Sequence, residues 1–170
     1  MDRFISPTME AEITYLMGEH LQGPGVALAD ARRAVSGAAP SMEIVDSRVE
    51  DWRVKLADTV ADLASNGAMV IPDEFVAVDS FDSRLVGMVL SRNGEVIDTG
   101  AGAAALGDPL EVVAWLANVL GERGLGLEPR HLVMTGALHA AVPLAAGDHF
   151  LAEFDRVGSV SLNVVDTLAD

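Results

Sequence analysis

Two glutamates, Glu10 and Glu12, stand at alternate positions of the otherwise apolar run 9–17. A β-strand directs residues i and i+2 to the same face, so this spacing places two carboxylates side by side. Their repulsion costs free energy unless a positive charge lies between them. Short acid-x-acid pairs are also common on solvent-facing strand edges, so the pair alone is compatible with a surface edge or with a cation site.

A third carboxylate favours the cation site. Glu43 lies in the apolar run 41–47, where a lone acid is not expected in a core. Three carboxylates converging from two strands would form an oxygen-only site, which suits Mg²⁺ or Mn²⁺ and not zinc. Asp46 is a competing third ligand, although in a regular strand it faces the opposite way from Glu43. Periodicity alone leaves the convergence open.

Other candidate groups carry weaker signals. The four histidines are scattered along the chain: His20, His131, His139 and His149. They lack a ligand spacing such as HxxxH, and each is interpreted as a surface or loop residue and not as a ligand. Asp58 and Asp62 lie four residues apart, as on a solvated helix face. No nucleophile elbow, P-loop or dinucleotide fingerprint occurs, and the small residues of 100–107 are interpreted as tight packing.

The composition favours a folded, acidic protein. Half of the 170 residues are hydrophobic, the formal net charge is -15, and no run of basic residues occurs. Such a charge would repel nucleic acid and anionic membranes, so neither is expected as a partner. The absence of cysteine excludes disulfides and zinc-thiolate sites. We also expect no membrane span of ~20 apolar residues and no signal peptide, and therefore a soluble cytoplasmic protein.

Several segments have the patterns of strands. Alternating apolar residues predict a strand over 9–17, and apolar runs predict short strands over 41–47 and 68–72, the latter buried. The run 131–138 predicts a strand that leads into a loop at Thr135-Gly136. Two β-hairpins are expected, over 85–100 around the turn-forming pair Asn93-Gly94 and over 148–165 with a turn near 156–158.

Three segments have the patterns of helices. The first, 27–40, is expected to stop at Gly37 and Pro40, and the last, 107–124, begins with Asp108 as N-cap and Pro109 as N1. The middle segment, 50–67, is expected to be helical at its centre, with one apolar stripe. That stripe consists of Trp52, Leu56, Val60 and Leu63 or Ala64. Together, the expected strands and helices predict a strand-rich α+β (or mixed α/β) fold in one domain over residues 1–170.

Four stretches in this order resemble the 2-keto-4-pentenoate hydratase branch of the fumarylacetoacetate hydrolase superfamily. They are "SPTMEAEITYLMG", "SMEIVDSRVEDWRVKLADTVADLAS", "RNGEVIDTGAGAAALGDPLEVVAWLAN" and "HLVMTGALHAAVPLAAGDHFLAEFDRVGSVSL". The resemblance covers nearly the whole chain, and the ordered combination is far more specific than any single stretch. It implies a strand-rich mixed sheet-and-roll fold of that family's type with a few packed helices, and assembly into homo-oligomers.

The resemblance also assigns residues. It implies that Glu10, Glu12 and Glu43 hold Mg²⁺ or Mn²⁺ and that Ser65 is a catalytic residue near the substrate. The TGAL loop would place Thr135 and Gly136 at the substrate's carboxylate or oxo group. The implied reaction is the metal-dependent hydration of 2-hydroxypenta-2,4-dienoate to 4-hydroxy-2-oxopentanoate, in the meta-cleavage catabolism of aromatic or steroid rings.

The chain departs from the family pattern in two places. Relatives carry a long segment ahead of the ExE strand, with a lysine and an aspartate credited with proton transfer, so we expect an N-terminally truncated form. Leu63 stands where relatives tend to have asparagine.

Three alternatives remain open. One is a 2-oxo-3-enedioate decarboxylase, which would need a cation for the distal carboxylate, with Arg48, Arg53 and Lys55 the basic residues nearest the site. A C–C hydrolase of acylpyruvates is another, and a truncated, non-catalytic metal-binding subunit is the third.

Overall fold

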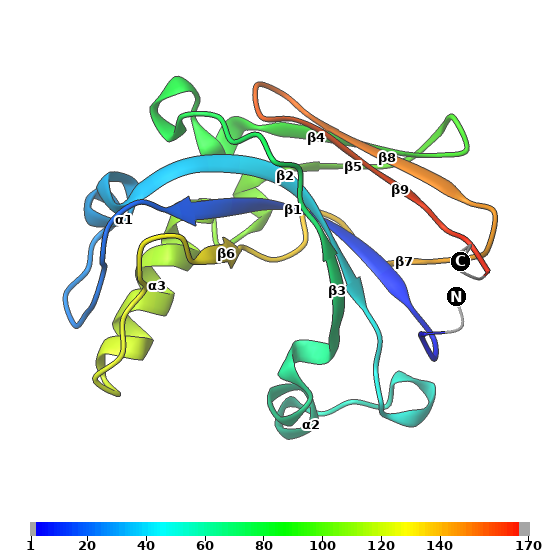
Figure 1. The fold of residues 1–170 in the computed structure, drawn as a ribbon, viewed down its shortest axis with the longest axis horizontal. Coiled ribbons are helices and arrows are strands. Elements are labelled where there is room, and N and C mark those ends of the chain that lie inside the picture. Colours follow the sequence, from blue (N-terminus) through cyan, green and yellow to red (C-terminus); the bar gives the residue numbers. More distant parts are fainter. Residues whose placement is uncertain (1–2, 167–170) are drawn as a thin grey trace.

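The computed structural model of the chain describes residues 3–166, whose strands form two sheets (Figure 1). The first sheet has the order β3-β2-β1-β6, and β7 also pairs with β1. Its strands are β1 (Thr8–Met17), β2 (Val35–Val45), β3 (Asn66–Val70), β6 (Leu132–Met134) and β7 (Val142–Pro143). The second sheet has the order β5-β4-β8-β9. Its strands are β4 (Gly87–Arg92), β5 (Glu95–Ala101), β8 (His149–Phe154) and β9 (Gly158–Asn163). Every pairing between these strands is antiparallel.

Helices and single turns complete the described part of the chain. The α-helices are α1 (Leu28–Ala34), α2 (Leu56–Ala61) and α3 (Pro109–Gly121). The single turns are η1 (Glu50–Trp52), η2 (Leu63–Ser65), η3 (Val78–Ser80), η4 (Ser83–Leu85) and η5 (Gly102–Ala104). The predicted strand-rich α+β fold with a few helices is confirmed.

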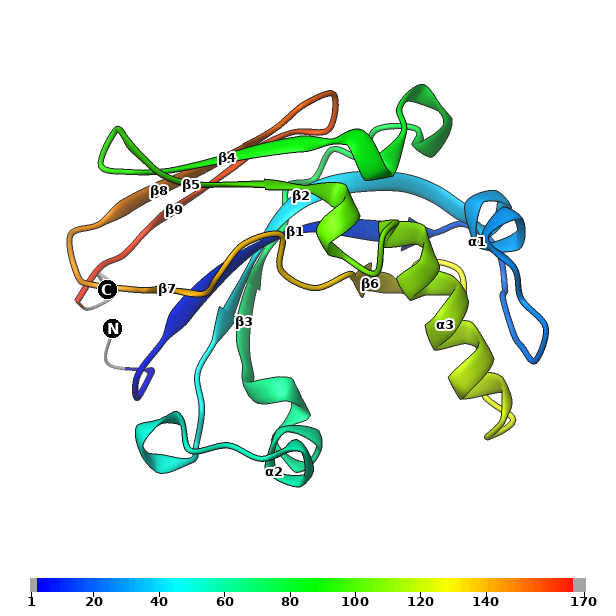
Figure 2. The same ribbon diagram turned by 180° about the vertical axis from the view of Figure 1, so that it is seen from behind.

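The β1–β2 pair lies between the second sheet and the β2–β3 connection. Both views show the second sheet on one side of these strands and the connection that contains α2 on the other (Figure 1, Figure 2). Met9, Ala11, Ile13 and Tyr15 of β1 are fully buried in the hydrophobic core. Since side chains alternate along a strand, the even-numbered residues of β1 face the other way, toward the α2 connection.

Both predicted hairpins are confirmed. In the first, Asn93 and Gly94 have φ values of 55° and 85° between β4 and β5, as a type I′ turn requires. In the second, Arg156 in the turn between β8 and β9 and Gly158, the first residue of β9, have positive φ values.

The last helix is also confirmed, with its cap. The Asp108 carboxylate accepts hydrogen bonds from the Leu110 N–H at 3.0 Å and from the Ser83 hydroxyl at 2.6 Å. The segment Gly102–Gly121 is long and apolar enough to span a membrane, so the expectation that no such stretch occurs is wrong. Its α-helical part has only 13 residues, ~20 Å against a hydrocarbon core of ~30 Å. Leu110 and Val113 are fully buried, as in a core helix.

Two boundaries differ from the prediction. The helix expected over 27–40 ends at Ala34, and β2 begins at the next residue and runs through Gly37 and Pro40. The Ala-rich composition of this segment favours a helix, but the pairing of β2 with β1 along most of the strand outweighs that weak local preference. The strand expected over 68–72 is β3. It is an edge strand and not the buried strand that was expected, since 53% of the surface of Met69 is exposed.

The segment 50–67 is helical at its centre, as predicted, over α2, whereas the predicted apolar stripe is wrong. Only α2 is helical, and Asp51, Trp52, Leu63, Ala64 and Ser65 have positive φ values in the turns on either side. The apolar stripe does not face the core. Its members are largely exposed: Leu56 81%, Val60 71% and Leu63 80%.

Candidate metal centre

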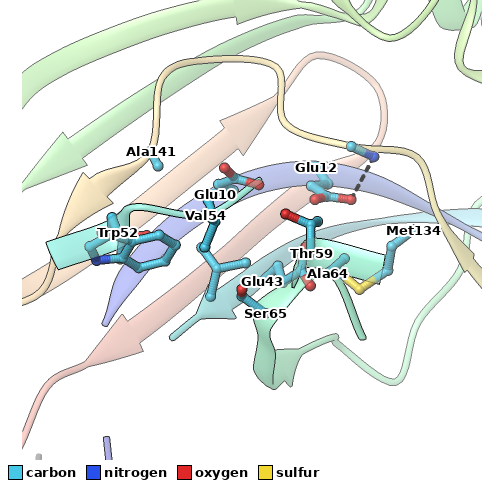
Figure 3. A pocket seen from close by; sticks show the side chains of 13 residues that line it. Glu10, Glu12, Glu43, Trp52, Val54, Thr59, Ala64, Ser65, Met134 and Ala141 are labelled. Carbon is cyan, nitrogen blue, oxygen red and sulfur yellow. Dashed lines mark hydrogen bonds between the residues drawn. The ribbon is translucent and has the colours of Figure 1, made fainter. Parts of the chain in front are cut away.

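The three glutamates singled out by the sequence meet at one place (Figure 3). Glu10 of β1 lies directly opposite Glu43 of β2, and Glu12 lies two residues further along the same face. One carboxylate oxygen from each residue lies within 4.8 Å of the other two. The register of one antiparallel pair therefore produces the convergence that periodicity left open.

Glu12 is the most deeply buried member, with 1% of its surface exposed. Its Oε2 accepts a hydrogen bond from the Gly136 N–H at 2.8 Å, whereas Oε1 has no hydrogen-bond partner among the described residues. Burial, only partly offset by the Gly136 N–H and reinforced by the Glu43 carboxylate, raises the pKa of Glu12 to about 8. Burial and the Glu43 charge also raise the pKa of Glu10. A buried acceptor oxygen that lacks a partner and lies among other carboxylates is costly in free energy. A divalent cation bound at this place would remove that cost.

The third glutamate is held from the neighbouring strand. Asn66, the first residue of β3, donates its side-chain N–H to Glu43 Oε1 at 2.6 Å. Hydrogen bonds of this kind orient metal ligands in proteins. Asn66 was not predicted from the sequence, because its side chain reaches Glu43 only through the β2–β3 pairing, in which Asn66 lies opposite Val45.

Asp46 belongs to a different structure. Its carboxylate accepts the N–H groups of Ile5 and Ser6, at 2.9 and 2.7 Å, and so fastens the segment ahead of β1. The expectation that it faces away from Glu43 agrees with this arrangement.

Ser65 lines the same pocket as the glutamates. Its hydroxyl donates to the Asp62 carboxylate at 3.0 Å, and Asp62 lies 3.5 Å from the Arg48 guanidinium. Asp62 was interpreted as part of a solvated helix face, but it orients the serine instead. With its proton directed to Asp62, the Ser65 oxygen keeps its lone pairs for a group in the pocket.

Three consecutive residues without glycine, Leu63, Ala64 and Ser65, adopt left-handed φ values of 53°, 58° and 59°. This conformation costs an L-residue roughly 1–2 kcal/mol, and asparagine tolerates it better than leucine. We therefore expect Leu63→Asn to raise the free energy of unfolding by about 1 kcal/mol. Urea denaturation measures the change, and Leu63→Ala serves as the control, since it removes the exposed side chain but keeps the backbone strain. Equal stability of the two variants would contradict this explanation.

The loop that follows β6 lies beside β1, in the position that a neighbouring strand would otherwise occupy. The Thr135 hydroxyl donates to the Ile13 carbonyl oxygen at 2.8 Å, and the Gly136 N–H reaches Glu12. Gly136 has a φ value of +92°, which residues with a side chain rarely adopt. Gly136 therefore lies in the pocket beside Glu12, whereas the Thr135 hydroxyl is occupied by the backbone and holds the loop in place.

The histidines divide into two groups. His20, His131 and His149 are exposed, in agreement with their interpretation as surface residues. His139 lies in the loop between β6 and β7, but its imidazole has no exposed area. Its Nε2 accepts the N–H of Ala11, the residue between Glu10 and Glu12, at 2.8 Å.

The carboxylates open into a pocket of about 610 Å³. Its walls also contain Thr8, Val45, Trp52, Val54, Thr59, Ala64, Met134 and Ala141 (Figure 3). No basic side chain is among the described residues that line it. Arg48 is bonded to backbone carbonyls and Asp62, Arg53 to Glu50, and Lys55 is exposed.

Comparison with known proteins extends this description. Residues 4–165 match the family described as fumarylacetoacetate (FAA) hydrolase C-terminal. The chain is 41% identical over 162 residues to a 2-hydroxyhexa-2,4-dienoate hydratase of Comamonas testosteroni, covering 95% of this chain and 61% of that protein. It is 40% identical over 163 residues to a 4-oxalocrotonate decarboxylase of Pseudomonas putida, covering 96% and 62%.

A solved structure shows the same fold. The 4-oxalocrotonate decarboxylase from Pseudomonas putida G7, complexed with magnesium and adipate, superposes with a TM-score of 0.92 at 40% identity over 95% of this chain and 62% of that one. The chain thus spans about three fifths of the length of the relatives that it matches.

Proposed function

Because the chain belongs to the fumarylacetoacetate hydrolase family, we propose that it catalyses the metal-dependent hydration of 2-hydroxypenta-2,4-dienoate to 4-hydroxy-2-oxopentanoate. This carbon–oxygen lyase reaction belongs to the catabolism of aromatic or steroid rings after meta-cleavage. The observation that carries the proposal is the convergence of three carboxylates on a pocket without a basic side chain among its described lining residues.

Glu10, Glu12 and Glu43 would hold Mg²⁺ or Mn²⁺. The fit rests on the donor set, which is all oxygen and anionic, and on the buried, unpartnered Oε1 of Glu12. A divalent cation supplies Lewis-acid stabilisation to a substrate with adjacent carboxylate and 2-oxygen groups. The magnesium complex of the decarboxylase from Pseudomonas putida G7 supports the assignment.

The overall reaction moves two protons and one hydroxyl group. The substrate's 2-hydroxyl loses its proton while C5 gains one, which gives a 2-oxo-3-enoate with an electrophilic C4. Water then adds its hydroxyl to C4 and a proton to C3. The pocket must therefore orient a water molecule next to C4 and bind the oxygens at C1 and C2.

The chain's own groups divide this work. Ser65, whose proton is directed to Asp62, accepts a hydrogen bond from the water or from the substrate's 2-hydroxyl group. A serine is too weak a base to remove a proton unaided, so its role is orientation. Gly136 lines the pocket where the substrate's oxygens would bind, with its N–H bonded to Glu12, and Thr135 supports it by fixing the loop to β1.

The pocket favours the hydratase over a decarboxylase of 2-oxo-3-enedioates. A dioate would bring a second carboxylate into a site already lined by three, and burial of an unpaired charge is costly. The walls beyond the glutamates are largely apolar and suit the uncharged diene end of a monocarboxylic substrate.

The test is direct. The purified chain with Mg²⁺ or Mn²⁺ is incubated with 2-hydroxypenta-2,4-dienoate, and the loss of the diene absorbance is followed, with EDTA as the control. In parallel, CO₂ release from 4-oxalocrotonate is measured. We expect metal-dependent loss of the diene and little CO₂. CO₂ release without diene loss would favour the decarboxylase, and no reaction despite bound metal would reject both.

Replacing Ser65 with alanine should lower kcat about 10- to 100-fold and leave Mn²⁺ affinity nearly unchanged, because the serine orients reactants and does not bind the ion. Steady-state kinetics and calorimetry measure the two effects. Ser47→Ala is the matched control, since Ser47 is a buried serine of the same connection that bonds to Val49. Equal kcat values for Ser65→Ala and the parent would remove Ser65 from the site.

The proposal also includes the oligomeric state and the cellular location of the chain. The chain acts as a homo-oligomer in the cytoplasm on a small 2-hydroxy-dienoic acid, without nucleic acid or membrane partners. The exposed apolar side chains Val89, Val96 and Ile97 of the second sheet support assembly, and the net charge of -15 argues against nucleic acid and anionic membranes as partners.

A further inference from the structure

The strand that carries two of the three glutamates has a gap in its backbone pairing. On the side away from β2, β1 pairs with β7 at Thr8 and Met9 and with β6 from Thr14 onward. Between these ladders the chain after β6 leaves strand geometry, so the groups of β1 in the gap need other partners. Ala11, which is fully buried, lies in the middle of this gap.

Two groups of the loop close the gap at Ala11. The Leu138 N–H donates to the Ala11 carbonyl oxygen at 3.1 Å, as a neighbouring strand would. The Ala11 N–H, however, donates to the Nε2 of His139 at 2.8 Å. A side chain therefore supplies the acceptor that a backbone carbonyl supplies elsewhere in the sheet.

The hydrogen bonds of His139 assign its tautomer. Since Nε2 accepts an N–H, it carries no proton, and the proton lies on Nδ1, 2.6 Å from the Ala140 carbonyl oxygen. The imidazole has no exposed area, and Nδ1 also lies 3.8 Å from the Asp98 carboxylate. Gly100 packs closely behind the loop, since a Cβ there would lie 2.3 Å from the Leu138 carbonyl oxygen.

We propose that His139 is a positioning residue for the carboxylate cluster: its Nε2 fixes the backbone between Glu10 and Glu12 and so sets how the two carboxylates meet Glu43. The inference rests on the proposed metal site. His139 itself is not a ligand, because its Nε2 lone pair is already used by Ala11. Loss of the acceptor would leave the Ala11 N–H buried and unpaired and would let this part of β1 shift.

Two substitutions separate the two ring nitrogens. In His139→Gln the amide oxygen can take the place of Nε2 and accept the Ala11 N–H. In His139→Asn the shorter side chain can replace only Nδ1 and leaves Ala11 without an acceptor. We expect Mn²⁺ affinity, measured by calorimetry, to fall about 10-fold in His139→Asn and to stay close to the parent value in His139→Gln. His149→Asn, at an exposed position, is the control.

The outcomes are distinguishable. Equal Mn²⁺ affinity in the parent and both variants would overturn the positioning role, and so would equal losses in both variants accompanied by equal losses of thermal stability, which a purely structural role predicts. No Mn²⁺ binding by the parent chain would instead overturn the metal site.

A measurement on the parent chain keeps the inference testable if His139→Asn does not fold. ¹⁵N-resolved NMR should show His139 as the Nδ1–H tautomer, with the Ala11 amide protected from hydrogen exchange. An Nε2–H tautomer would overturn the inference.

Discussion

The Glu43→Gln variant should lose the proposed divalent-metal binding and, with it, the proposed hydratase activity. Calorimetry with Mn²⁺ should show a loss of affinity on the order of 100-fold or more, since ligand removal should exceed the 10- to 100-fold effect of outer-shell changes. The substitution keeps the size of the side chain and an oxygen that can accept from Asn66, so the fold should persist. What disappears is one of three negative charges around the ion.

A charge-matched control isolates the local effect. Glu153→Gln makes the same change in net charge at an exposed position of β8, in the other sheet. It should bind Mn²⁺ like the parent chain. If Glu43→Gln also binds like the parent, the three-carboxylate site is wrong.

Without metal, the stability of the protein should fall as the pH rises from about 5 to about 8. The pKa of Glu12 is raised to about 8 from an ordinary 4.5, so between these values the unfolded chain has released a proton that the folded chain retains. Stability decreases with pH wherever the unfolded state binds fewer protons. The expected loss is about 3 kcal/mol, and the raised pKa of Glu10 adds to it in the same direction.

Urea denaturation at several pH values in EDTA measures this slope. Glu12→Gln should flatten the curve, because the titrating group is gone. Saturating Mg²⁺ should restore stability at pH 8, since the ion binds the ionised carboxylates and displaces the proton. Parallel curves for the parent and Glu12→Gln would show that the pKa of Glu12 is not raised.

Local patterns predicted the elements with strong signals. The alternation along β1 placed Glu10 and Glu12 on one face, the Asn93-Gly94 pair fixed a hairpin, and Asp108 marked the start of α3. Each of these signals depends on neighbours within a few residues. Glu43 was found for a related reason, since an acid in an apolar strand is conspicuous wherever the strand lies.

Features that depend on contacts between residues far apart in the sequence could not be predicted from local patterns. β2 begins within an Ala-rich segment because β1 lies beside it, and no local signal marks the left-handed turn at Leu63–Ser65, which contains no glycine. Asn66 reaches the Glu43 carboxylate across 23 residues of sequence, and His139 reaches the backbone of Ala11 across 128. Their roles depend on the register of strands and the path of a loop, which residue types alone do not encode.

The face-to-face pairing of Glu10 with Glu43 also limits how the gene can change in length. Insertion or deletion of one residue inside either strand reverses the direction of every side chain beyond it and turns a carboxylate into the hydrophobic core. The connection 18–27 between β1 and α1 is free of this constraint, because added residues there reverse no strand. Working descendants of this sequence should therefore accumulate length changes in that connection and almost none within the two strands.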